Sequence, residues 1–253
     1  MTPRLDETLL RSATYEILSL AFLYPDEAAI QTLRDGAEKL SDHSGVAGWD
    51  GMSSVLAALA TKLERADFEI LEREHTEIFG HTISTDCAPY EAEYGQAHVF
   101  QKSQAMADLS TFYGAFGLQV SPDLKDRLDH ISVEMEFMHF LALKEARGHA
   151  NGDGDDRVLL CRQAQEGFLT HHLAEWILVF AQRLARKAPT DGVYSTLARL
   201  LDTHMAMEFQ RFNLDATSPD ASHQYEDESP DQEEECGDVL APSSVGEGEA
   251  VAR

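Results

Sequence analysis

Apolar side chains recur along most of the chain at the spacing of one helix face. The first such stretch covers residues 5–23, and it should end at Tyr24-Pro25, because a proline disfavours helical backbone in the residue before it. No strand-like alternation of useful length occurs. The sequence therefore predicts an all-α fold, a single globular helical domain of about 8–10 helices. The pattern predicts these helices over residues 5–23, 27–39, 52–65, 67–79, 98–116, 121–147, 156–187 and 191–212.

Several residues predict where these helices begin and where a loop separates them. Asp26 suits the N-cap of the second helix. Ser121 with Pro122 predicts the start of the helix that runs to about residue 147, because proline is favoured at the first helical position. Gly, Thr, Ser, Asp and Pro cluster in residues 80–89 and predict a loop, which residues 90–94 follow as a short helix or turn.

The end of the chain has a different composition. From Asp215 on, Ser, Pro, Asp, Glu and Gly largely replace the big apolar residues, which predicts a helical domain over residues 1–214 and a disordered acidic tail over 215–253. The net charge of −25 argues against nucleic acid and against anionic membrane surfaces as partners. It fits a positively charged partner, or solubility in a salty habitat. One hypothesis is a helical scaffold whose tail binds basic partners.

Cysteines and the N-terminus favour a cytoplasmic protein. The three cysteines are odd in number and form no Cys-x-x-Cys pair, so neither a disulfide framework nor a thiolate metal site is expected. The first residues lack the basic and apolar regions of a signal peptide. No apolar run reaches about 18 residues, so no stable membrane insertion is expected.

The segment from Asp129 to Met138 carries the most distinctive pattern. Wound as a helix, it places His130 and Glu134, four residues apart, in the middle of a broad apolar arc, with Asp129 at the edge. An ionisable pair on an apolar face costs free energy unless it is satisfied. The pattern therefore indicates either a buried hydrogen bond or a binding site. The arc consists of Ile131, Val133, Met135, Phe137, Met138, Phe140 and Leu141.

Two Glu-x-x-His pairs, Glu72/His75 and Glu136/His139, suggest a dinuclear metal centre as an alternative. In helical bundles two such pairs and two further glutamates bind a pair of metal ions. The first pair shares a helix face with apolar residues, whereas the second lies opposite the apolar arc. One pair faces in and the other out, which disfavours this alternative.

His130 and Glu134 also suit two ligands of a mononuclear zinc site, because residues i and i+4 share a helix face. A third ligand would come from elsewhere, for example His75. A His–Glu hydrogen bond explains the same pair without a metal. The main alternative function is therefore a helical-bundle metalloprotein that uses Glu72, His75, His130 and Glu134.

The segment from Pro89 to Tyr94 places two tyrosines and two carboxylates directly after the predicted loop. Tyrosine offers a rigid apolar face with a polar tip, which suits the recognition of a peptide. Ordinary packing of a loop onto the core explains the same residues.

Three segments together are similar to a known family. Residues 74–80, 89–94 and 129–138 occur in order, after a first helix that ends in Leu-Tyr-Pro. This arrangement resembles the TorD/DmsD/NarJ family of cytoplasmic chaperones for molybdenum enzymes. The resemblance spans about residues 10–212, and its most specific part is Asp-His-x-x-x-Glu-x-x-Phe-Met at residues 129–138.

The resemblance implies an all-helical protein that binds a partner and catalyses nothing. Members bind the twin-arginine signal peptide, the apo catalytic subunit of a molybdopterin oxidoreductase, or both, and hold the subunit until its cofactor is inserted. No cofactor of the chaperone itself is expected. The oligomeric state is expected to be a monomer or a dimer that exchanges helices.

The residues agree with such a ligand. Two arginines followed by an apolar stretch need carboxylates for the guanidinium groups and an apolar groove for the rest. Asp129, Glu91 and Glu93 would meet the arginines, and the resemblance places Asp129 and His130 in the binding region. The predicted peptide site consists of Tyr90, Glu91, Tyr94, Asp129, His130, Glu134, Phe137 and Met138.

Overall fold

The computed structural model describes the helical part of the chain, and in it every element larger than an isolated β-bridge is a helix. The described residues are 3–43, 46, 48–80, 86–94, 99–119, 127–152 and 155–214. They confirm the all-α class and the expected number of helices. The elements are α1 (Pro3–Ala21), α2 (Glu27–Ser41), α3 (Asp50–Arg65), α4 (Phe68–Phe79), η1 (Glu91–Glu93), α5 (Val99–Ala115), α6 (Ile131–Asn151), α7 (Asp155–Phe168), η2 (Leu169–Leu173), α8 (Ala174–Lys187) and α9 (Val193–Arg211). The predicted tail over residues 215–253 lies outside the described residues.

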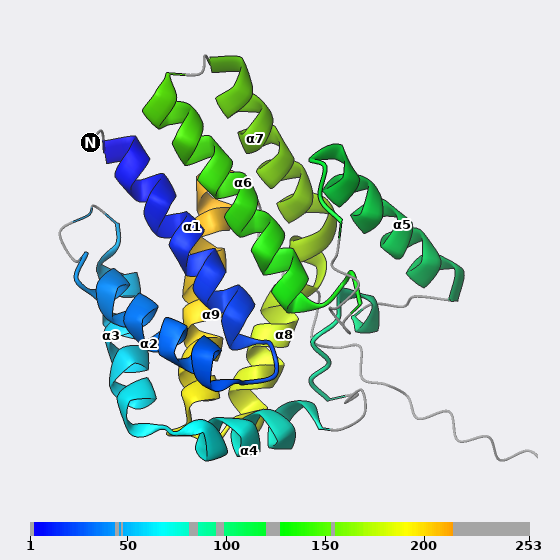
Figure 1. Ribbon diagram of the computed structural model, residues 1–253. Coiled ribbons are helices and arrows are strands. Elements are labelled where there is room, and N and C mark those ends of the chain that lie inside the picture. The colour runs from blue at the N-terminus through cyan, green and yellow to red at the C-terminus, as the bar shows by residue number, and fades with distance from the viewer. Residues whose placement is uncertain are drawn as a thin grey trace, which may run out of the picture. The chain divides into compact units, whose positions relative to one another are not determined.

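The helices pack side by side around one apolar core. In Figure 1, α6 lies between α1 and α7, and it contacts both of them. The helix α9 packs against α8, α3 and α1, while α2 pairs with α3 and with α1. The helix α4 contacts α9. Within the described ranges, no helix combines the length and the apolar character needed to cross a membrane.

A buried ion pair crosses this core from α1 to α9. Arg11 donates two hydrogen bonds to the Glu208 carboxylate, and its Nη2 also donates to Gln165 Oε1 at 2.7 Å. Arg11 Nη1 lies 3.4 Å from Glu145 Oε2. Burial alone would raise the pKa of Glu208, but the charge and hydrogen bonds of Arg11 outweigh it and lower the pKa to about 2. One guanidinium group therefore ties α1 to α6, α7 and α9.

The start of α6 differs from the prediction. The predicted start at Ser121 lies outside the described residues, but residues 127–130 are described, and they form a turn and an isolated β-bridge instead of helix. The helix begins at Ile131, and His130 is its N-cap. The prediction that His130 lies in the middle of a helical face is therefore wrong. Its backbone pairs with Tyr90, which is distant in the sequence, and helix begins only after this pair.

The long helix predicted over residues 156–187 is interrupted. A π-helical turn at Leu169–Leu173 separates α7 from α8. Such a turn inserts one residue into the helical repeat and changes the direction of the side chains that follow it, and π turns occur often at functional sites. Here the turn contains His172, which is buried.

Candidate functional site

The candidate site begins where two short backbone segments meet. The backbone N–H of Glu91 donates to the carbonyl oxygen of Asp129 at 3.0 Å, and that of Ile131 donates to Pro89 at 2.9 Å. Tyr90 and His130 thereby form an antiparallel β-bridge. The two segments that the sequence analysis assigned to one site are therefore in direct contact, although α5 separates them along the chain.

The Asp129 carboxylate is held by neighbouring groups of the same chain. Arg127 Nε donates to Oδ1 at 2.9 Å, and Arg127 Nη2 donates to Oδ2 at 2.7 Å. The backbone N–H of Ala92 also donates to Oδ2, at 3.1 Å. The Asp129 side chain is 0% exposed, whereas that of Arg127 is 35% exposed. Asp129 therefore lies beneath Arg127 and not at an open rim.

Glu93 and Tyr90 complete the surroundings of the Arg127 guanidinium group. Arg127 Nη1 donates to Glu93 Oε1 at 2.9 Å, and Lys102 Nζ donates to Glu93 Oε2 at 3.0 Å. The guanidinium carbon lies 4.6 Å from the centre of the Tyr90 ring, a cation–π contact. Burial would raise the pKa of Glu93, but the hydrogen bonds from Arg127 and Lys102 lower it below its ordinary value.

His130 connects this cluster to the start of α6. Its Nδ1 accepts a hydrogen bond from the backbone N–H of Ser132 at 3.2 Å, which caps the helix. Its ring meets the Tyr90 ring edge to face, with centroids 5.1 Å apart. His130 therefore fixes both the direction of α6 and the position of the Tyr90 ring under Arg127.

The Glu91 side chain is buried, and its partner is a histidine of another helical segment. Its Oε1 lies 3.0 Å from Nδ1 of His172, the residue that the π-helical turn presents. Both side chains are buried. The π turn thus brings a histidine of the α7–α8 segment to the carboxylate of η1.

Glu134 forms a carboxyl pair with Glu91. The Glu134 side chain is fully buried, and Trp176 Nε1 donates to its Oε2 at 3.2 Å. Burial, and next the negative charge of Glu91, raise the pKa of Glu134 well above its ordinary value. Both effects favour the neutral form of the Glu134 carboxyl group.

We expect the Glu134→Gln variant to be more stable than wild type, by a margin that grows as the pH rises. The unfolded chain releases the Glu134 proton near pH 4.5, whereas the folded chain releases it only at a higher pH, so wild-type stability falls as the pH rises above 4.5, by up to about 1.4 kcal/mol per pH unit. A glutamine is neutral at every pH and still accepts from Trp176. Urea unfolding between pH 5 and 8 should show a variant whose advantage over wild type grows with pH.

The matched control is Glu136→Gln, because Glu136 lies on the same helix and is exposed. It should follow the wild-type pH dependence. Parallel curves for Glu134→Gln and wild type would show that Glu134 is ionised in the folded protein.

The apolar members of the predicted site lie deeper than its carboxylates. Phe137 and Met138 are 2% and 0% exposed and belong to the core. Tyr94 is half-buried, donates its hydroxyl to the carbonyl oxygen of Ala88 at 2.8 Å, and packs against Trp176 with ring centroids 5.2 Å apart. In this structure the Tyr90 ring, and not Phe137 or Met138, contacts the guanidinium group of Arg127.

The four residues of the metal hypothesis do not come together at one place. Glu72 accepts a hydrogen bond from the Tyr24 hydroxyl, and the His75 ring packs against Tyr24 and Phe79. Glu134 instead lies with the Glu91 carboxyl group. Across the described ranges, no group of three or more His, Cys, Asp or Glu side chains is placed to hold a metal ion.

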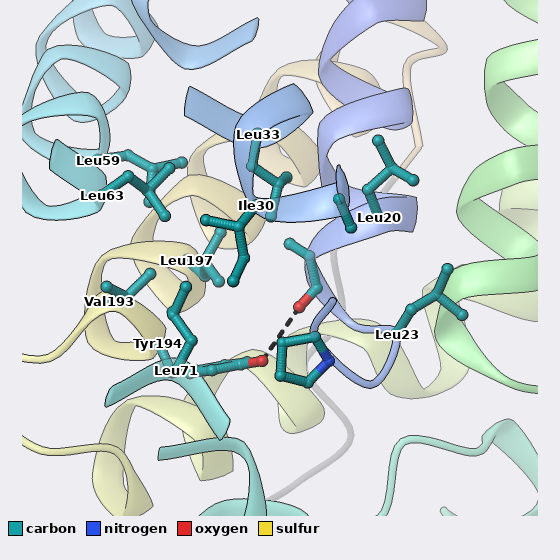
Figure 2. Close-up of a pocket in the computed structure, with 13 residues that line it drawn as sticks. Leu20, Leu23, Ile30, Leu33, Leu59, Leu63, Leu71, Val193, Tyr194 and Leu197 are labelled. Carbon is teal, nitrogen blue, oxygen red and sulfur yellow. Dashed lines mark hydrogen bonds between the residues drawn. The ribbon is translucent and has the colours of Figure 1, made fainter. Parts of the chain in front are cut away.

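An apolar pocket lies elsewhere in the helical unit. Figure 2 shows it between the α1–α2 turn, α2, α3, α4 and α9, with leucine side chains on several sides. The Tyr194 hydroxyl donates across it to the carbonyl oxygen of Ala21 at 3.3 Å. None of the predicted site residues lines this pocket. The pocket is lined by Leu20, Ala21, Leu23, Pro25, Ala29, Ile30, Leu33, Leu59, Leu63, Leu71, Val193, Tyr194 and Leu197.

Four residues of the site were not identified from the sequence, namely Arg127, Lys102, His172 and Trp176. Arg127 precedes Asp129 by two residues, which is a weak local signal for an ion pair. His172 and Trp176 lie in a segment predicted as plain helix, and no local pattern marks a π-helical turn. These residues become visible only when the long-range contacts are known.

Comparisons with known proteins agree with the resemblance. Residues 48–182 match the sequence profile of the family described as "Nitrate reductase delta subunit". The perchlorate reductase assembly chaperone protein of Dechloromonas aromatica (strain RCB) is 25% identical over 210 residues, which cover 80% of this chain and 91% of the relative. The chlorate reductase assembly chaperone protein of Ideonella dechloratans is 35% identical over 100 residues, which cover 39% of this chain and 50% of the relative.

A solved structure shares the fold. A crystal structure described as a redox enzyme maturation protein from Archaeoglobus fulgidus superposes with a TM-score of 0.51. The match covers 77% of this chain and 93% of the other, at 24% identity. At this identity the similarity establishes the arrangement of helices and nothing more.

Proposed function

The chain belongs to the nitrate reductase delta subunit family, and on that premise we propose that it is an assembly chaperone for the catalytic subunit of a molybdenum-containing reductase. The perchlorate and chlorate reductase assembly chaperones among its relatives support this class of partner. In this proposal the protein acts by binding and not by catalysis. It holds the subunit in the cytoplasm until the cofactor of that subunit is inserted.

The proposed ligand is the twin-arginine signal peptide of the catalytic subunit. One observation carries this proposal: two carboxylates, Asp129 and Glu93, and the ring of Tyr90 together surround a guanidinium group. Arginine binds best where carboxylates accept its parallel N–H groups and an aromatic ring covers its face. The cluster therefore has the chemistry that recognition of an arginine side chain requires.

The apolar stretch of the peptide would lie against the rings that border the cluster. Tyr90 and Tyr94 are half-buried, and the Tyr90 ring lies against the guanidinium group that the two carboxylates hold. Phe137 and Met138 lie in the core, and methionine adapts its shape to varied apolar ligands. His130 and Glu134 would act indirectly, by holding Tyr90 and Trp176 in place.

The oligomeric state and the role of the predicted tail remain parts of the proposal. We expect a monomer or a dimer that exchanges helices. Because the carboxylate cluster lies within residues 86–152, removal of residues 215–253 should leave peptide binding intact. Loss of binding on truncation would favour instead a scaffold whose tail binds basic partners.

Calorimetric titration tests the proposal. The ligand is a synthetic signal peptide from the reductase encoded beside the gene, and a twin-lysine version is the control. We expect micromolar or tighter binding that weakens with the lysines, because an ammonium group does not form the two parallel hydrogen bonds of a guanidinium group. Equal binding of both peptides would contradict arginine recognition. No binding to any neighbouring signal peptide would contradict the proposed ligand.

A further inference from the structure

We infer that Arg127 occupies, from within the chain, the subsite that an arginine of the partner peptide takes on binding. The inference rests on the proposed function, and it adds that the Arg127 guanidinium group has to leave Asp129 before the peptide binds there. Arg127 is then an internal competitor that fills the site while no client is present. The ligand of this subsite is a guanidinium group.

The contacts of Arg127 satisfy its guanidinium group from three directions. Nε and Nη2 form two parallel hydrogen bonds to Asp129, at 2.9 and 2.7 Å, and Nη1 reaches Glu93 at 2.9 Å. The Tyr90 ring covers one face at 4.6 Å. These contacts use the planarity and the donor spacing of a guanidinium group, which a lysine lacks.

A second arginine cannot reach Asp129 while Arg127 is in place. The Asp129 side chain is 0% exposed, and its two oxygens already accept three hydrogen bonds. One of these comes from the backbone of Ala92, which the peptide cannot replace without moving η1. The other two come from Arg127. A peptide arginine therefore binds Asp129 only by taking the place of Arg127.

The position of Arg127 makes this exchange simple. Its side chain is 35% exposed, so rotation about its side-chain bonds carries the guanidinium group into solvent while the core stays closed. The exchange replaces one guanidinium group by another. Asp129 therefore keeps a partner in both the free and the bound protein, and a buried carboxylate is never left without a cation.

Arg127→Ala tests the inference by removing the competitor. A ligand that has to displace an internal group binds with an affinity reduced by the fraction of protein in which the site is open. We therefore expect the variant to bind the twin-arginine peptide roughly tenfold more tightly than wild type. Arg127→Lys should fall between the two, because lysine keeps the charge but forms weaker contacts.

A matched control removes an exposed arginine elsewhere. Arg73→Ala changes the net charge by the same amount, and Arg73 lies exposed on α4. It should leave the affinity for the peptide unchanged. A gain in both variants would mean that the greater negative charge of the protein, and not the vacated subsite, attracts the peptide.

A small probe tests the subsite without any peptide. Ethylguanidinium chloride should raise the melting temperature of Arg127→Ala more than that of wild type, because it supplies the missing cation to Asp129. Sodium chloride at equal concentration corrects for screening. The absence of a selective rise would overturn the assignment of a guanidinium subsite.

The two proposals fail in distinguishable ways. If wild type prefers the twin-arginine over the twin-lysine peptide but Arg127→Ala binds equally or more weakly, the inference is wrong and the proposed function stands. If neither protein binds the peptide, the signal-peptide proposal fails, and a selective effect of ethylguanidinium then supports the subsite alone.

Discussion

Asp129→Asn is expected to weaken binding of the twin-arginine peptide by about tenfold or more in a chain that also carries Arg127→Ala, because a hydrogen bond to a charged group contributes roughly 1.5–3 kcal/mol. In the otherwise wild-type chain the same substitution should have a much smaller effect. There the peptide loses its contact with Asp129, but Arg127 loses the same contact, so the cost of displacing Arg127 falls as well.

This comparison is a double-mutant cycle measured by calorimetric titration. Its expected signature is a large coupling between positions 127 and 129 for peptide binding. The control is Glu136→Gln, which removes an exposed carboxylate from α6, the helix that follows, and should change the affinity little in either background. An equal loss for Asp129→Asn in both backgrounds would show that Arg127 and the peptide do not compete. No loss in either would remove Asp129 from the site.

The helices could be predicted from the sequence because their signals are local. Periodic apolar positions located α1 to α5 to within a few residues of the observed bounds. Asp26 was expected to cap α2, and its side chain does accept the backbone N–H of Ala29, at 2.8 Å. Each such signal lies within one helical turn of its effect, so no knowledge of the fold is needed to read it.

The arrangement of the site could not be predicted in the same way. The apolar spacing continues through His130 and therefore predicts that it lies in the middle of a helix face. In the structure the His130 backbone pairs with Tyr90, and α6 begins only at the next residue, Ile131. The ion pair of Arg127 with Asp129 depends on that pairing. Local periodicity therefore placed Asp129 at the edge of a helix face, while the structure buries it beneath Arg127.

The buried ion pair in the core leads to the largest expected effect on stability. Arg11→Met should lower the free energy of unfolding by about 3–5 kcal/mol at pH 7, because it takes from the buried carboxylates the cation that is hydrogen-bonded to them. Glu208 would lose both of its charged hydrogen bonds, and Glu145 would lose an ion pair. Urea unfolding measures the effect. The control Arg73→Met removes an exposed arginine and should change stability by less than about 0.5 kcal/mol.

The pH dependence identifies the cause of that loss. In wild type the pKa of Glu208 is about 2, below its ordinary value of 4.5, so its contribution is complete above pH 4.5 and is lost as the pH falls toward 2. Without Arg11, burial raises the pKa of Glu208 instead. As the pH falls from 8 to 5, Glu208 in the variant becomes protonated, and the buried charge that destabilises the variant is removed. The difference between variant and wild type should therefore shrink over that range, and Arg11→Met/Glu208→Gln should recover part of the stability at pH 7. A difference that stays constant with pH, with no recovery in the double variant, would mean that Arg11 stabilises the core by packing and not by its charge.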